Sequence, residues 1–227
     1  MMYDGITTDA IFLLSQNRFE NSKEFYEANK AKINDGIVMP MRQIVSALAE
    51  DMAKIDEKFT ILPNRAVSRV RRDTRFTKDK SLYRDHMWLS FERSKQEFQN
   101  YPGFWFEVTP EGYGYGMGYF APTPAFMDFQ RGILLAKEKE FLKAAAKALK
   151  TGAELAGEEY KRKKPGDYSE AISPYCNRKD IYFPKTVAGH ENLADERILA
   201  ELRGNYREMA DVYRFFVGVA DEFAAKV

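Results

Sequence analysis

The side chains with the most evident chemistry lie between Ser68 and Asp85, in the segment SRVRRDTRFTKDKSLYRD. We call this segment the basic loop. Its eighteen residues hold seven Arg or Lys and three Asp, a local charge of +4, whereas the whole chain carries only +1. Guanidinium groups offer a planar fork that suits phosphate or carboxylate, and ammonium groups offer a compact charge. A concentrated positive field on a nearly neutral body predicts a place that meets an anion.

The basic loop therefore predicts a binding site for a small ligand that bears a phosphate or carboxylate group. In this site Asp73 and Asp79 would orient neighbouring cations, and Arg178 and Lys179 would fold back from a later part of the chain. Phe76 and Tyr83 have a simpler use as anchors that dock the loop. The predicted ligand-binding residues are Arg72, Asp73, Arg75, Lys78, Asp79, Lys80, Tyr83, Arg84, Arg178 and Lys179.

The same residues have a second interpretation, because networks of Arg, Lys and Asp also pin long connections to a sheet. The protein would then be a non-catalytic interaction or scaffold protein, and the loop would only be structural. A third class, nucleic-acid binding, is disfavoured: such domains usually have a pI above about 9, and the pI of this chain is about 7.7.

Other candidate side chains carry weaker signals, and none supports the assignment of a catalytic residue. His86 follows the basic loop directly and could act as a general acid or base. Cys176 stands near Arg178 and Lys179, which would lower its thiol pKa if they were also close in space. We predict no cofactor and no metal site, because a field of cations repels divalent ions and two His with one Cys cannot form a His/Cys zinc site.

Composition narrows the class of protein further. With 44% hydrophobic and 30% charged residues the chain is typical of a soluble globular protein. No window approaches the roughly 18 apolar residues of a membrane span, and the first ten residues lack the features of a signal peptide. A single cysteine excludes an internal disulfide. These observations predict a cytoplasmic protein without a membrane partner, and they leave its oligomeric state open.

Helical periodicity appears before and after the basic loop. The first predicted helix is capped by Thr7 or Thr8, and the second begins at Asn21, which has Glu24 three residues later. A long amphipathic stripe follows to Ile55, and Pro40 predicts a kink or a fresh start within it. Further helices are predicted from Thr123-Pro124 onward and over 198–219, whereas 151–192 is expected to be rich in loops.

Between these helices the hydrophobic period changes to two, which predicts strands over 67–72, 86–93, 104–108 and 112–119. A turn at Thr109-Pro110-Glu111-Gly112 joins the last two as a hairpin. In the last strand glycine alternates with Tyr or Met, so all its glycines should share one face, where another group can approach closely. Helices around a block of antiparallel strands indicate one α+β domain over residues 1–227, with an antiparallel sheet flanked by N-terminal and C-terminal helices.

The run from Arg72 to Arg84, RDTRFTKDKSLYR, resembles the R-D-x-R-F-x-K-D-K-x-P-Y-K signature of a microbial family catalogued as domain of unknown function 2461. Asn21 to Tyr26 is similar to the N-N-R-E-W-F segment of that family, and GEEYKRKKPGD at 157–167 is similar to another of its segments. Leu82, Arg84 and Phe25 depart from the family pattern, where Pro, Lys and Trp stand. The resemblance extends from about Thr8 to Thr186 and implies an α+β fold without an established activity.

Overall fold

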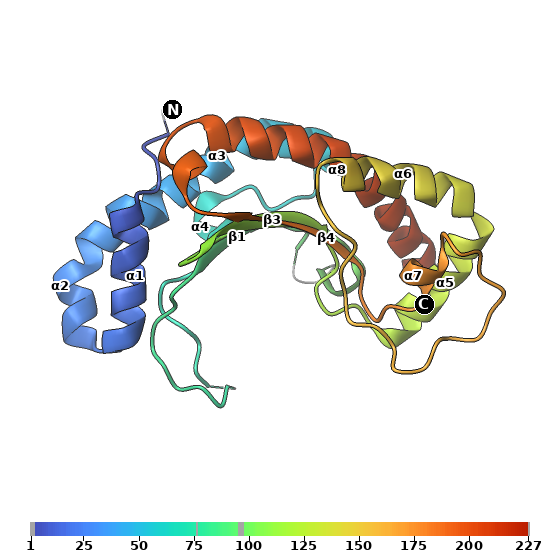
Figure 1. Cartoon of the computed structure of the whole chain (residues 1–227), viewed down its shortest axis with the longest axis horizontal. Helices are drawn as coiled ribbons and strands as arrows, with labels where there is room; N and C mark the ends of the chain where they lie inside the picture. The colour runs from blue at the N-terminus through green and yellow to red at the C-terminus, as the bar shows by residue number, and fades with distance from the viewer. Residues whose placement is uncertain (1–2, 76, 95–97, 227) are drawn as a thin grey trace.

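Four strands form one antiparallel sheet in the order β1-β2-β3-β4. In the computed structural model, which describes residues 3–226 except 76 and 95–97, they are β1 (Met87–Phe91), β2 (Gly103–Thr109), β3 (Gly112–Gly118) and β4 (Tyr182–Ala188). β2 and β3 form the predicted hairpin, with Thr109 opposite Gly112. The sheet lies between N-terminal and C-terminal helices, so the predicted α+β class is confirmed (Figure 1).

Two helices begin at the capping residues that the sequence predicts. Thr7 caps the first helix by accepting from the Ala10 amide, and Thr123 does the same for the Phe126 amide. A π-helical stretch, Asn34–Val38, leads into the third helix, which has Pro40 in its first turn. The helices are α1 (Thr8–Glu20), α2 (Lys23–Ile33), α3 (Met39–Ile55), α4 (Pro63–Ala66), α5 (Pro124–Ala136), α6 (Glu138–Lys150), α7 (Ser173–Cys176) and α8 (Arg197–Ala224).

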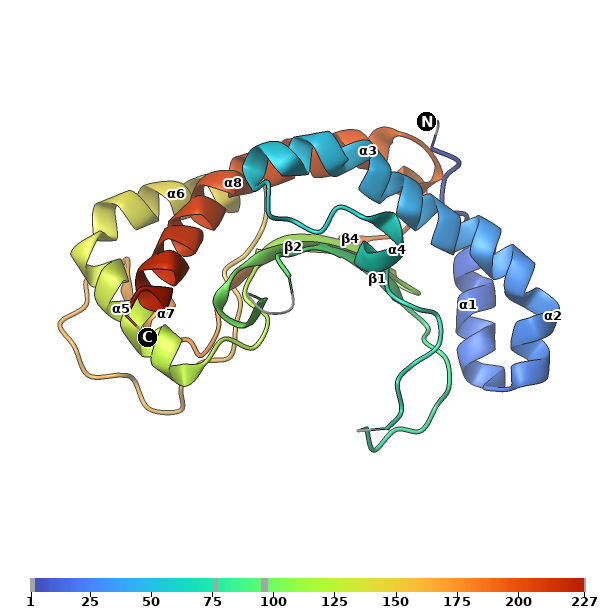
Figure 2. The ribbon, with the colours of Figure 1, turned by 180° about the vertical axis from the view of Figure 1, so that it is seen from behind.

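One face of the sheet is buried under α3 and α8 (Figures 1 and 2). Alternate residues of the strands point to these helices, as in the row formed by Leu89, Phe106 and Tyr115, each fully buried. Tyr206 of α8 packs on this row and donates its hydroxyl to the Trp105 carbonyl at 2.7 Å. Burial of apolar surface stabilises the fold by about 25 cal/mol per Å². This layer is therefore the main core that holds the sheet in place.

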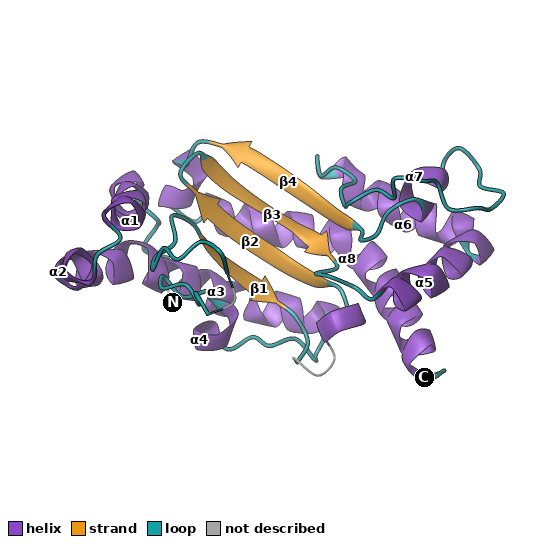
Figure 3. Cartoon of the chain, turned by 90° about the horizontal axis from the view of Figure 1, so that it is seen from below, coloured by secondary structure: helices purple, strands orange, loops and turns teal. Residues whose placement is uncertain are grey.

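The other face is open: no helix among the described residues covers it, and Figure 3 looks directly onto its strands. Trp88, Trp105 and Glu107 alternate with the buried residues and therefore lie on this face. The glycines of β3 share it, as the sequence predicts. A β-carbon at Gly116 would lie 2.5 Å from the Trp105 ring. The bare glycine thus lets the indole of the neighbouring strand lie on the sheet.

The open face is bordered at both ends. The basic loop and the α1–α2 pair stand where β1 begins, and the long segment between β3 and β4, which includes α5, α6 and α7, stands at the opposite end (Figures 1 and 3). The strand register fixes this arrangement, since the first residue of β1 lies opposite the end of β2 and β4 runs back from the far end. No helix of the described part of the chain is long and apolar enough to cross a membrane.

Two sequence predictions of local structure are wrong. Ser22, not Asn21, caps α2, while Asn21 adopts the left-handed conformation (φ 49°) that ends α1 and that Asn tolerates well. Residues 67–72 form only isolated bridges, Val67 to Leu89 and Arg71 to Tyr83, in place of a strand. Residues 151–192 are mostly irregular, as predicted, but they also contain β4, which was not predicted. Pro184 obscures its alternation and is tolerated because β4 is an edge strand.

Candidate functional site

The two arms of the basic loop pair with each other and are docked by aromatic packing. The Arg72 amide donates to the Leu82 carbonyl at 2.8 Å, and the Arg84 amide donates to the Val70 carbonyl at 3.0 Å. Tyr83 is buried and stacks on Tyr26 of α2, with ring centroids 4.9 Å apart. Asn21, at the end of α1, accepts from the Leu82 amide at 2.6 Å. Tyr83 therefore occupies the position of an anchor, and Phe76 lies outside the described residues.

Asp79 organises the base of the loop. Its carboxylate accepts from Arg18 of α1 at 2.8 Å, from Arg72, and from both the amide and the hydroxyl of Ser81. The hydrogen bonds from Ser81, and then those from Arg72 and Arg18, hold the pKa of this carboxyl well below its usual range. Asp79 thus carries a full negative charge at neutral pH and ties the loop to α1.

Asp73 makes a local pair near the tip of the loop. It accepts from the Arg75 guanidinium at 2.6 Å and from the Arg75 amide at 3.1 Å. These hydrogen bonds lower the pKa of Asp73 to about 2. Both side chains are exposed, so this pair contributes little to stability. It does hold the Arg75 side chain beside Asp73.

An arginine-rich depression of about 470 Å³ lies beside the outgoing arm of the loop. We call it the arginine depression. Among the described residues no carboxylate lies within ion-pair distance of Arg69, Arg71 or Arg84, although all three line it. Its lining residues are Ser68, Arg69, Arg71, Arg72, Asp73, Thr74, Arg75, Arg84 and Trp88. Five guanidinium groups thus surround a space that holds one carboxylate.

Arg84 links this depression to the open face of the sheet. Its guanidinium lies 4.4 Å from the centre of the Trp88 ring, and its Nε donates to the Arg69 carbonyl at 3.2 Å. Burial lowers the pKa of Arg84, and repulsion from Arg72 lowers it further. The positive charges therefore repel one another here, and an anion placed among them would relieve that repulsion.

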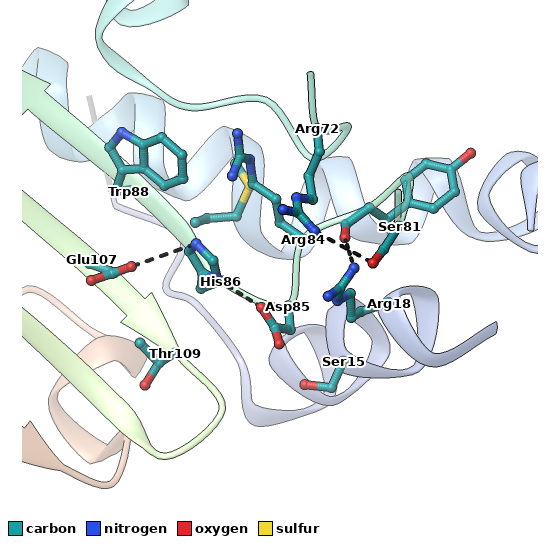
Figure 4. A network of polar contacts seen from close by, with 12 residues as sticks. Ser15, Arg18, Arg72, Ser81, Arg84, Asp85, His86, Trp88, Glu107 and Thr109 are labelled. Carbon is teal, nitrogen blue, oxygen red and sulfur yellow. Dashed lines mark hydrogen bonds and ion pairs between the residues drawn. The ribbon is translucent and has the colours of Figure 1, made fainter. Parts of the chain in front are cut away.

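A carboxylate–imidazole pair stands where the loop enters β1 (Figure 4). Asp85 lies 2.7 Å from Nδ1 of His86, and Nε2 of His86 lies 3.9 Å from Glu107 of β2. Burial by itself would raise the pKa of Asp85, but hydrogen bonding with His86 lowers it below its usual value. His86 thus stands between two carboxylates, with Asp85 at Nδ1 and Glu107 at Nε2.

The remaining predicted site residues lie elsewhere. Lys78 is exposed and does not line the arginine depression, and Lys80 donates to the Thr74 carbonyl at 2.8 Å. Arg178 and Lys179 pair with Glu159 and Glu158. They precede β4, at the opposite end of the sheet from the basic loop.

Cys176 is buried, and burial raises its pKa to about 11, so its thiol is protonated at neutral pH. Within the described residues, no group of three or more His, Cys, Asp or Glu could hold a metal ion.

Sequence reasoning missed four residues of this region: Arg69, Arg71, Trp88 and Glu107. Arg69 and Arg71 alternate with buried Val70, which is the signal that places both on the exposed side of the arm. Trp88 and Glu107 are cross-strand partners, and only the register of β1 and β2 brings them together.

Comparison with known proteins gives one result. The model of a family described as a conserved hypothetical protein, domain of unknown function 2461, matches residues 9–215. None of the curated proteins with which the chain was compared matches it.

Proposed function

Since the chain belongs to the family of domain of unknown function 2461, whose description names no activity, we propose its function from the site. The protein is a cytoplasmic binder of a small ligand that bears a phosphate or carboxylate group. The ligand occupies the arginine depression. The observation that carries the proposal is the group of Arg69, Arg71 and Arg84, which face one space without a carboxylate partner among the described residues.

The electrostatics of the site support an anionic occupant. Asp79 neutralises the part of the loop that docks on α1, and Asp73 pairs with Arg75. The lowered pKa of Arg84 reflects burial together with repulsion from Arg72. A phosphate or carboxylate supplies the missing negative charge and accepts the paired N–H groups of a guanidinium fork.

The test is to titrate the protein with inorganic phosphate, sugar phosphates, nucleotides and dicarboxylates, with binding heat and melting temperature as readouts. Arg71→Gln removes one unpaired guanidinium, and Lys78→Gln is the matched control because Lys78 belongs to the same loop but does not line the depression. A charge-assisted hydrogen bond contributes about 1.5–3 kcal/mol. We therefore expect Arg71→Gln to weaken binding by roughly 10-fold to 100-fold, and Lys78→Gln to change it little. Equal losses in both variants, or no binding of any anion, would refute the site.

A second candidate, a scaffold protein with a structural loop, is favoured by one observation: Asp79 joins Arg18, Arg72 and Ser81. These contacts support a structural role for the part of the loop that docks on α1. This candidate function predicts that variants of Arg69 and Arg71 lower the melting temperature as much as variants of Asp79 do, with no anion binding in the wild type.

A further inference from the structure

We propose that the open face of the sheet binds a single strand of nucleic acid. Its bases stack on Trp88, Trp105 and Tyr182, and its phosphates are held at the two ends of the face. The inference rests on the proposed function, because the arginine depression supplies one of these ends. It extends that function from a single anionic group to a chain of phosphodiesters that carries planar rings.

The strand register places the three aromatic residues on one diagonal. Trp88 lies opposite Glu107, and Trp105 is two residues from Glu107 on the same strand and face. Trp105 lies opposite Gly116, which pairs with Pro184, and Tyr182 is two residues from Pro184. The step from Trp88 to Trp105 crosses one strand spacing and two residues, a diagonal that long aromatic side chains can span. The step from Trp105 to Tyr182 crosses two strand spacings and two residues.

The glycines of β3 allow the rings to lie along this diagonal. Trp105 rests over Gly116, and its ring meets the Tyr182 ring edge-on, with centroids 6.1 Å apart. A β-carbon at Gly118 would collide with the Tyr182 side chain. Trp88, Trp105 and Tyr182 are each partly exposed on a face that no described helix covers. Aromatic side chains on the open face of a four-stranded antiparallel sheet are an established platform for unpaired bases.

Positive charge borders both ends of the diagonal. At the Trp88 end stands the arginine depression, and Arg84 contacts the Trp88 ring itself. At the Tyr182 end stands the segment that continues from Ala156, the bridge partner of Tyr182, into Lys161, Arg162 and Lys163. These three cations are exposed and have no carboxylate within ion-pair distance among the described residues. Figure 1 shows this segment and the basic loop projecting from the same side of the sheet.

The positions of the basic residues say more about the class of ligand than the net charge of the chain does. The near-neutral net charge of the chain disfavours a nucleic-acid ligand, but clusters of basic residues stand at the two ends of the open face. The diagonal crosses three strand spacings and four residues, or about 20 Å, which is long for one small anion. A strand lying along it can place phosphates at both ends and bases between them.

Glu107 adds a preference among bases. It lies on the open face beside Trp88, where its carboxylate would repel a phosphate but accept a hydrogen bond from an exocyclic amino group. Carboxylates read the N4 amino group of cytosine in this way. We therefore expect cytosine-rich strands to bind more tightly than thymine-rich or uracil-rich strands.

The experiment measures fluorescence anisotropy of labelled oligonucleotides of about 12 nucleotides: oligo(dC), oligo(rC), oligo(dT) and a duplex of mixed sequence. We expect the single strands to bind more tightly than the duplex, and Trp105→Ala and Tyr182→Ala each to weaken binding by about 10-fold or more. The triple variant Lys161→Ala, Arg162→Ala, Lys163→Ala should weaken binding and flatten its dependence on salt. The DNA and RNA arms identify which sugar the face accepts.

Matched controls test the location of the site. Phe12→Ala removes an exposed aromatic ring of α1, and Lys139→Ala, Lys143→Ala, Lys150→Ala removes three exposed charges from α6, which packs on α8. Neither should alter oligonucleotide binding. Trp105→Phe retains a stacking ring and should retain most of the affinity, so it separates lost stacking from lost folding.

Three results would overturn the inference. If phosphate binds and Arg71→Gln weakens it, but no single strand binds, the open face is not a nucleic-acid site and the proposed function stands. If oligonucleotides bind but Trp105→Ala, Tyr182→Ala and the triple variant all leave the affinity unchanged, the strand lies elsewhere. If neither phosphate nor oligonucleotide binds, both proposals fail.

Discussion

Asp73, Asp79 and Asp85 stand at equal intervals of six residues, yet each holds a different part of the loop in place. Asp79 joins the loop to α1, Asp73 pairs within the loop tip, and Asp85 holds His86 at the start of β1. None of the three pairs with Arg69, Arg71 or Arg84. Of the five arginines that line the arginine depression, Arg72 and Arg75 are thus paired with carboxylates of the loop, and Arg69, Arg71 and Arg84 have no carboxylate partner among the described residues.

Replacement of Asp79 by Asn should loosen the basic loop from α1. The variant removes the ionic partner of Arg18 and Arg72, so we expect a lower melting temperature and faster amide exchange over residues 72–83. Asp73→Asn is the control, because the contacts that Asp73 makes with the described residues lie within its own loop. If both variants exchanged equally fast, the Arg18–Asp79 contact would not be what docks the loop.

At this scale the sequence predicts the kind of chemistry but only part of the site. A dense run of Arg, Lys and Asp is visible in any reading of 68–85, and Tyr83 is recognisable as an anchor. Which arginines lack a carboxylate is decided by side-chain directions on the two arms. Arg178 and Lys179 could not be placed from the sequence, because the strand register sets them at the far end of the sheet.

Among the elements, β3 shows most directly how a sequence pattern controls a surface. Its glycines share the open face, but only some are required by close contacts. At Gly116 a β-carbon would meet both the Trp105 ring, at 2.5 Å, and the Phe183 carbonyl, whereas at Gly114 its nearest neighbour would be the Lys185 carbonyl at 3.4 Å. Neither glycine has a positive φ.

This difference gives a paired prediction. Gly116→Ala should lower the free energy of unfolding by about 1–3 kcal/mol, the usual cost of overpacking, and should displace the Trp105 ring. Gly114→Ala has room for its methyl group and should be neutral or stabilise the protein by up to about 1 kcal/mol, since alanine restricts the unfolded chain. Urea denaturation measures both. Equal destabilisation would show that the contact with Trp105 is not what requires glycine.

The elements that periodicity predicts best are those with one apolar face. The stripe of α8, the alternation of β1 and the hairpin of β2 and β3 all follow from it. Apolar and charged residues also alternate along the arms of the basic loop. These arms form only two isolated bridges among the described residues, because their charged side chains remain in water. β4 was not predicted, because Phe183 is its one fully buried residue and a single apolar position gives no alternation.

Across the whole molecule, one buried ionic cluster joins the layers behind the sheet. Arg93, which follows β1, donates to Asp56 at 2.8 Å, and Tyr213 of α8 donates to the same carboxylate at 2.5 Å. Asp56 directly follows α3, and the Asp56 and Arg93 side chains are 8% and 6% exposed. Burial would raise the pKa of Asp56, but the hydrogen bonds from Tyr213, from the Lys58 amide and from Arg93 lower it overall.

Replacement of Asp56 by Ala should therefore destabilise the whole fold. Removing one partner of a buried ion pair costs about 3–5 kcal/mol, whereas Glu50→Ala, which breaks the exposed Glu50–Lys54 pair, should cost less than about 1 kcal/mol. Because the pKa of Asp56 is lowered on folding, its contribution is complete above the unfolded value of about 3.9 and is lost as pH falls below it. The difference between wild type and Asp56→Ala should narrow in acid. A difference that stayed constant down to pH 2 would contradict this assignment.

The two basic borders of the open face lie at opposite ends of the sheet, because the basic loop precedes β1 and the segment after Ala156 follows a bridge to the first residue of β4. β2, β3 and β4 each span seven residues. The length of these strands therefore sets the distance between the basic loop and the segment after Ala156. Loop sequences can change without altering that distance, but inserting two residues into each strand would add about 7 Å while leaving every side chain on its original face. A change in strand length would thus adapt this fold to ligands of a different length.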